Sequence, residues 1–65
     1  MLKPEILRQI AGDTPLMARI AGIRRVSFQT VERWVQNNHP SLMHIKILEE
    51  IAQSFKIKNL KDLYE

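Results

Sequence analysis

Apolar residues recur along this chain every three or four positions, which is the spacing of one face of an α-helix. The pattern divides into five segments, each bounded by residues that favour turns. No stretch alternates apolar and polar residues for long enough to indicate a β-strand. The sequence therefore predicts an all-α domain of about five helices, over residues 4–11, 15–21, 27–37, 41–55 and 59–64.

The expected helix boundaries depend on residues that start or stop helices. Pro15 suits the first turn of the second helix, where a missing N–H costs nothing. Gly12 and Gly22 are expected to end the first and second helices. Ser27 and Ser41 are natural N-caps for the third and fourth helices, because a serine hydroxyl accepts a free backbone N–H.

The inner faces of these helices are expected to form one core. The chain has 65 residues, which permits one domain spanning 1–65. A domain of this size buries only about 60% of the surface that its unfolded form exposes. The expected core positions are Ile6, Leu7, Ile10, Leu16, Met17, Ile20, Phe28, Val31, Trp34, Val35, Leu42, Ile45, Leu48, Ile51, Ala52, Phe55, Ile57, Leu60 and Leu63.

The segment 27–37 is distinguished by its outer face. Gln29, Arg33 and Gln36 fall opposite the apolar side, and Thr30 and Asn37 fall at its edge. Lys and Glu usually dominate a face that serves solubility alone. Gln, Thr, Arg and Asn instead hydrogen-bond base edges and phosphates. This face is therefore a candidate for nucleic-acid recognition.

The net charge of +3 is concentrated in one short segment. The charges of residues 1–18 cancel, as do those of residues 41–65. The excess lies in residues 19–33, where four arginines stand against Glu32 alone. Arginine suits bidentate contacts with phosphate and guanine, and focused positive charge is typical of a nucleic-acid footprint. On charge alone, a solvated basic face is an equal alternative.

Other classes of function lack support. There is no cysteine for a disulfide or a thiolate metal site, and the spacing of His39 and His44 does not place both on one helical face. No serine has a histidine and acid partner, and no glycine-rich phosphate loop is present. We therefore expect no enzyme activity, cofactor, metal or small-molecule ligand. The lack of a membrane-length apolar run, of a signal peptide and of cysteine predicts a cytoplasmic protein.

The segment MARIAGI, followed by SFQTVERW, resembles the helix-turn-helix of the phage-repressor (Cro/cI, XRE-like) family. Ala18 matches the small residue that lets two helices approach closely, and Gly22 matches the turn glycine. Ser27 matches the serine that opens the recognition helix. HPSLMHIKILEEIAQSF and LKDLYE are similar to the later helices of the family, so the resemblance covers nearly the whole chain.

Two departures from the family pattern stand out. The residues IRRV between Gly22 and Ser27 add three residues and two positive charges, which predicts an extended turn. The fourth helix, measured from Pro40 to Ala52, is about one turn longer than the family pattern.

The resemblance implies a sequence-specific transcriptional regulator, a phage-type repressor or a Cro-like protein, whose third helix enters the major groove of double-stranded DNA. The residues expected to read bases are Ser27, Gln29, Thr30 and Arg33. The residues expected to contact phosphates are Arg19, Arg24, Arg25, Gln36, Asn37 and Asn38.

Two questions about partners stay open. A weak homodimer, formed on DNA, is expected from the small area that one module buries on a duplex. Leu60, Leu63 and Tyr64 either offer surface to a second copy or close the core. The alternative function is a protein-binding helical module, such as an antirepressor or a factor that docks on polymerase or repressor. Glu32 is the one residue of the third helix that fits poorly beside phosphates.

Overall fold

Four α-helices and two short 3₁₀ helices make up the regular structure in the computed structural model, which describes residues 1–65. No strand is present, apart from one isolated antiparallel bridge. The all-α class is therefore confirmed, but there are four α-helices rather than five. In chain order the elements are α1 (Pro4–Ala11), α2 (Thr14–Arg24), α3 (Phe28–Asn37), η1 (Pro40–Met43), α4 (Ile45–Ser54) and η2 (Leu60–Asp62).

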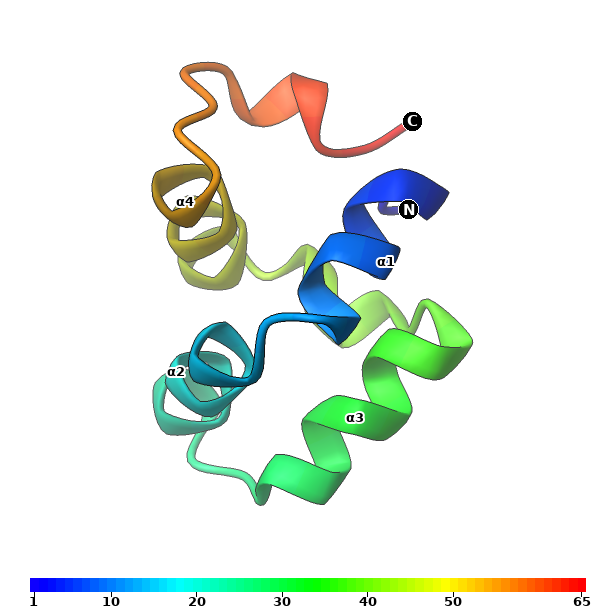
Figure 1. Ribbon diagram of the computed structural model, residues 1–65, viewed down its shortest axis with the longest axis vertical. Coiled ribbons are helices and arrows are strands. Elements are labelled where there is room, and N and C mark those ends of the chain that lie inside the picture. Colours follow the sequence, from blue (N-terminus) through cyan, green and yellow to red (C-terminus); the bar gives the residue numbers. More distant parts are fainter.

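The helices surround one core (Figure 1). α2 and α4 are seen end-on, one above the other, while α3 lies across the bottom of the view. α1 lies between α3 and the C-terminal segment, so that α3 contacts both α1 and α2. The two ends of the chain pair through the bridge between Leu2 and Tyr64, and the Lys3 N–H donates to the Leu63 carbonyl at 3.0 Å.

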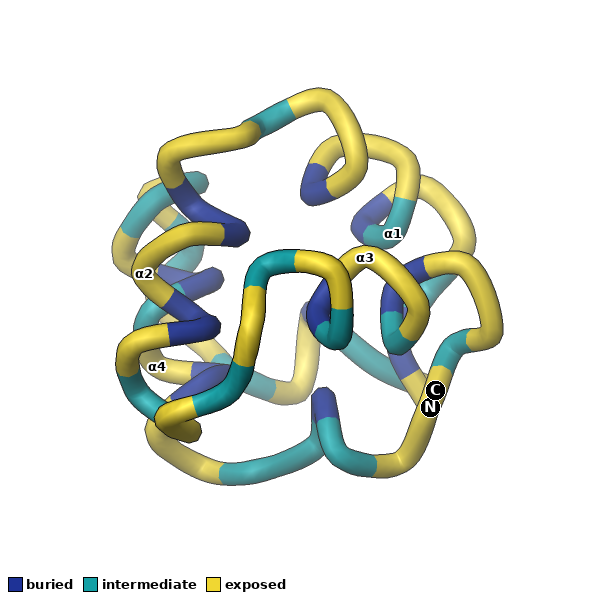
Figure 2. The backbone as a smooth tube through the Cα atoms, turned by 90° about the horizontal axis from the view of Figure 1, so that it is seen from below, coloured by how far each residue is buried: buried dark blue, intermediate teal, exposed yellow.

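The core consists of 15 buried residues, and all of them are apolar. Figure 2 shows the buried segments of the helices turned toward the middle of the molecule. α1 to α4 each contribute at least one side chain that is fully buried, among them Ile10, Ile20, Val31 and Ile51. Phe28 and Trp34, which were expected in the core, are only partly buried and pack against its edge. No helix has both the length and the apolar character needed to cross a lipid bilayer.

The second helix does not stop at Gly22, as the sequence suggested, but continues to Arg24. A glycine inside a helix costs about 1 kcal/mol relative to alanine, which weakens a helix without ending it. The Asp13 carboxylate caps the start of α2 by accepting the Leu16 N–H at 3.1 Å. Ala18 was expected to face the neighbouring helix but is exposed, and Ala21 is the buried small residue of α2.

α2, α3 and α4 share one kind of C-terminal end. A non-glycine residue at the C-cap of α2 and α3, and one position beyond the C-cap of α4, lies in the left-handed region, with φ of 55° at Arg25, 48° at Asn38 and 57° at Lys56. In each case the next N–H reaches back to a carbonyl five residues earlier, as in a Schellman motif. These bonds run from Val26 to Ala21 (3.0 Å), from His39 to Trp34 (2.9 Å) and from Ile57 to Ala52 (2.8 Å).

The segment expected as one helix over 41–55 is broken at His44. Ser41 does not cap a helix but lies inside η1, where its N–H donates to His39 Nδ1 at 3.0 Å. His44 has an extended backbone and caps α4 by accepting the Lys46 N–H at 3.2 Å. The first part of the expected helix is therefore a separate 3₁₀ helix, η1, and the rest is α4.

The break at His44 also changes which isoleucine of α4 is buried. A continuous helix would place Ile45 on the same face as Leu42. In the structure Leu42 is fully buried from η1, whereas Ile45 is 54% exposed. Ile47 is fully buried instead. The sequence prediction of a buried Ile45 was wrong because it assumed one unbroken helical phase.

This difference predicts opposite results for the same substitution at two positions of α4. Ile47→Ala should destabilise the protein by roughly 2–5 kcal/mol, because it removes a fully buried side chain and leaves a cavity. Ile45→Ala should change the free energy of unfolding by less than about 0.5 kcal/mol. Urea denaturation measures both. Equal losses at the two positions would contradict the observed phase of α4.

Candidate nucleic-acid interface

The outer face of α3 is polar and exposed along its whole length. Val31 and Val35 face inward, with 0% and 7% of their surface exposed. The predicted phase of this helix is therefore confirmed. The side chains on the opposite side are exposed, and they are Gln29, Arg33, Gln36 and Asn37.

Ser27 and Thr30 start α3 and bond to one another. The Ser27 hydroxyl accepts the Thr30 N–H at 3.1 Å, so Ser27 is the N-cap that the sequence predicted. The two side-chain oxygens also lie 2.9 Å apart, within hydrogen-bond distance. Ser27 is exposed and Thr30 is half-buried. Any base contact by these hydroxyls therefore competes with bonds that already hold the first turn of α3.

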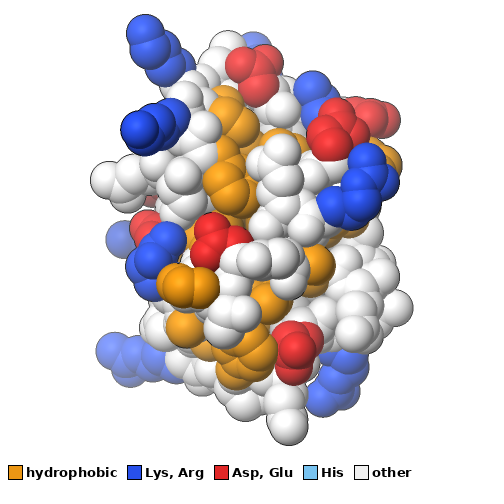
Figure 3. Space-filling view, viewed as in Figure 1, with side chains coloured by type: hydrophobic (Ala, Val, Ile, Leu, Met, Phe, Trp, Pro, Cys, Tyr) orange, Lys and Arg blue, Asp and Glu red, His pale blue; other side chains and the backbone are white.

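The connection between α2 and α3 is short and basic. α2 extends to Arg24, so only residues 25–27 join the two helices, and the extended turn expected from the sequence is largely an extension of α2. Arg24 and Arg25 are exposed at this connection, and Arg33 is exposed on α3. None of these three arginines forms an ion pair, because the single salt bridge of the protein lies elsewhere. Figure 3 shows Lys and Arg side chains projecting from both lower corners of the molecule, the end formed by α3 and the connection.

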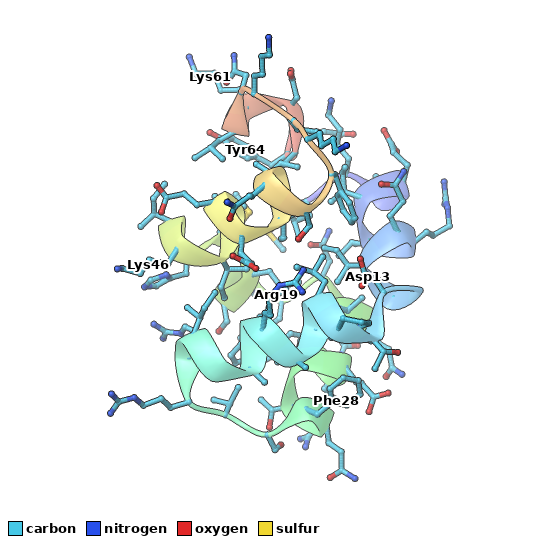
Figure 4. All side chains as sticks on the ribbon, turned by 60° about the vertical axis from the view of Figure 1, so that its left-hand side comes forward. Asp13, Arg19, Phe28, Lys46, Lys61 and Tyr64 are labelled. Atoms are coloured by element: carbon cyan, nitrogen blue, oxygen red, sulfur yellow. The ribbon has the colours of Figure 1, made fainter.

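Arg19 lies outside this surface. Its Nε donates to Glu50 Oε1, and its Nη2 donates to the Ser54 hydroxyl at 2.8 Å. Figure 4 shows Arg19 rising from α2 toward α4, away from α3. The expectation that Arg19 contacts phosphate does not agree with this geometry, because the guanidinium joins α2 to α4.

Asn38 is also engaged within the protein. It forms the left-handed C-cap of α3, and its Nδ2 donates to the Leu2 carbonyl at 3.1 Å. Its Oδ1 is buried without a hydrogen-bond partner. The amide therefore faces the N-terminal segment, and its expected role as a phosphate clamp is not supported. Asn37 is exposed, although its Nδ2 donates to the Arg33 carbonyl at 3.0 Å.

A shallow hollow of about 160 Å³ lies along one flank of α3 and opens to solvent. Its wall includes Trp34 and His39, whose rings stack with centroids 5.9 Å apart and planes 22° from parallel. Trp34 was expected in the core, whereas His39 falls between the helices expected over 27–37 and 41–55. Part of this hollow could have been predicted from the sequence, because four of its lining residues have the spacing i, i+3, i+4, i+7 and therefore lie on one side of a helix. The lining residues are Thr30, Arg33, Trp34, Asn37 and His39.

The apolar residues near the C-terminus close the core. Leu63 is fully buried, and Leu60 and Tyr64 are partly buried and pack against the core. Of the two roles left open by the sequence, the structure supports core closure and gives no separate apolar surface at the tail.

Comparisons with protein-family models, with curated proteins and with solved structures found no match to this chain. The interpretation of the α3 surface therefore depends on its geometry and chemistry.

The capping role of Ser27 predicts a matched pair of stability measurements. Ser27→Ala should lower the free energy of unfolding by about 1 kcal/mol, because the Thr30 N–H loses its acceptor. Ser41→Ala should have an effect below about 0.5 kcal/mol, because the Ser41 side chain caps nothing. Ser27→Asp should retain most of the stability, since aspartate is an equally good N-cap. Thermal or urea melts in which Ser41→Ala is the more damaging change would contradict this assignment.

Proposed function

We propose that this protein binds double-stranded DNA through the outer face of α3 and acts as a transcriptional regulator. The observation that carries the proposal is the arrangement of side chains on and beside α3. Its buried side carries valines, and its exposed side carries amides and the unpaired guanidinium of Arg33. Two further unpaired arginines, Arg24 and Arg25, lie at the connection that leads into α3. The resemblance of the sequence to the phage-repressor family supports the same function.

The dimensions of α3 suit the major groove. An α-helix with its side chains is about 10–12 Å in diameter, and α3 extends for about 15 Å at a rise of about 1.5 Å per residue. The major groove of B-DNA is about 12 Å wide and admits an α-helix. In this proposal α2, the short connection and α3 form a helix-turn-helix, with α3 as the recognition helix. The exposed end of α3 at the connection then enters the groove first.

The side chains of α3 divide between two roles in this complex. Gln29 can pair through its amide with adenine, and Arg33 can form two hydrogen bonds with guanine. Gln36 lies on the same exposed face, one turn further along the helix. Ser27 and Thr30 contact DNA only through hydrogen bonds that their hydroxyl groups can form in addition to those at the start of α3. The base-reading residues would provide the sequence preference, whereas Gln36 would contact a phosphate.

Arg24 and Arg25 provide affinity that is independent of sequence. Both side chains are exposed at the connection and form no ion pair, so phosphate binding breaks no existing contact. A protein-binding module would be favoured by an apolar or acidic outer face. α3 carries a single acidic residue, Glu32, and its outward positions are polar, so DNA is the better-supported partner.

The proposal predicts a steep salt dependence of DNA affinity that weakens when Arg24 and Arg25 lose their charge. The double variant Arg24→Gln, Arg25→Asn removes both charges and keeps a helix former at 24 and a residue that tolerates the left-handed region at 25. The slope of log K against log salt should flatten by about two units, because about 0.9 counterion is released per phosphate contact. Fluorescence anisotropy of a labelled duplex measures this slope.

The matched control is the double variant Lys46→Gln, Lys61→Gln, which removes the same charge. Figure 4 shows both lysines on parts of the molecule remote from Phe28 at the start of α3. Its slope should stay near that of the original protein. Equal slopes for the two double variants would remove the α2–α3 connection from the interface. No salt-dependent binding to any duplex would reject the proposed function.

A further inference from the structure

The hollow beside α3 shares two residues, Thr30 and Arg33, with the set proposed to read bases. Arg33 belongs to the exposed outer face and also lines the hollow, whereas Trp34 and His39 lie only on the flank. A group that occupies the hollow would therefore sit beside whatever α3 contacts. When a helix occupies the major groove, the structure that borders it is the sugar–phosphate backbone.

The lining of the hollow is rich in hydrogen-bond donors and contains no carboxylate. His39 Nδ1 accepts the Ser41 N–H at 3.0 Å. The neutral imidazole therefore carries its proton on Nε2 and keeps one N–H to donate. The Arg33 guanidinium forms no ion pair. Trp34 adds an apolar surface, which stacks with the His39 ring. This combination suits a ligand with an anionic end and an apolar ring.

We infer that the hollow binds one sugar–phosphate unit of the DNA backbone, with the deoxyribose against Trp34 and the phosphate near Arg33 and the His39 N–H. This inference rests on the proposed function and adds a specific binding site for the backbone of one strand. The existing stack of Trp34 on His39 favours the backbone over an extruded base. A base could not insert between the two rings without separating them, since their centroids are already only 5.9 Å apart.

The intrinsic fluorescence of Trp34 offers a direct test. Trp34 is the only tryptophan of the chain, so its emission reports on the hollow alone. A mixed-sequence duplex of about two helical turns, at low salt, should change this emission with the same midpoint as the anisotropy of the labelled duplex. Inorganic phosphate at the same concentration should leave the emission unchanged, because a free anion lacks the sugar and the neighbouring contacts.

Two histidine variants test the contact independently of the fold. His39→Asp keeps an acceptor for the Ser41 N–H but places a carboxylate at the hollow. It should weaken duplex binding about tenfold or more, since like charges in contact are strongly unfavourable. His44→Asp is the matched control, because His44 caps α4 in the same way, does not line the hollow and gives the same change in net charge. It should weaken binding by no more than about twofold. Thermal melts establish that both variants are folded.

The possible outcomes separate this inference from the proposed function. The inference is supported if the Trp34 emission changes with the same midpoint as the anisotropy and if His39→Asp loses more duplex affinity than His44→Asp. If the duplex binds without a change in Trp34 emission and the two variants have equal affinities, the inferred backbone site in the hollow is wrong. The proposed function is unaffected by that result. A larger emission change with single-stranded DNA than with the duplex overturns the inference in favour of base stacking. Absence of duplex binding in the unaltered protein overturns both.

Discussion

The inward packing of Val31 and Val35 determines what α3 can present to a partner. These valines lie in one cluster with apolar residues of α1 and α2, and because all 15 buried residues are apolar, packing rather than a buried polar network orients the helix. Fixing two positions four apart fixes the rotation of the whole helix. A shift of one residue would turn the helix by about 100°, which would carry Arg33 away from the outer face. The candidate interface is therefore a consequence of how a small core is filled.

Features that depend on local sequence could be predicted. α1 spans the residues that the pattern indicated, and Ser27 caps α3 as expected, because both depend on residues within one or two turns. The helical period was also enough to place Gln29 and Arg33 outside. It could not reveal that Arg19 binds Glu50, because the two residues are 31 positions apart and meet only when α2 packs beside α4. Nor could it place His39 on Trp34, since the chain reverses between them.

The errors at helix ends have a common physical cause. Glycine and serine were used as stop and start signals, but the helices end where the next apolar residue can join the core. α2 passes through Gly22 and ends just before Val26, which packs against the core. The segment after α3 breaks at His44, so that Leu42 and Ile47 are both buried. Tertiary burial thus overrides the local preference of a residue to start or stop a helix. Burying one aliphatic side chain stabilises the fold by about 1.5–3 kcal/mol, which is more than a typical helix cap contributes.

Arg25 connects the stability of the fold with its surface charge. Its backbone is left-handed, with a φ of 55°. That conformation costs an L-amino acid roughly 1–2 kcal/mol, whereas glycine adopts it freely. Glycine would also remove a positive charge from the connection between α2 and α3. Stability and positive charge therefore make opposite demands on position 25. Glycine there would give a protein that melts at a higher temperature, whereas arginine keeps a cation at the connection in a protein that melts more easily.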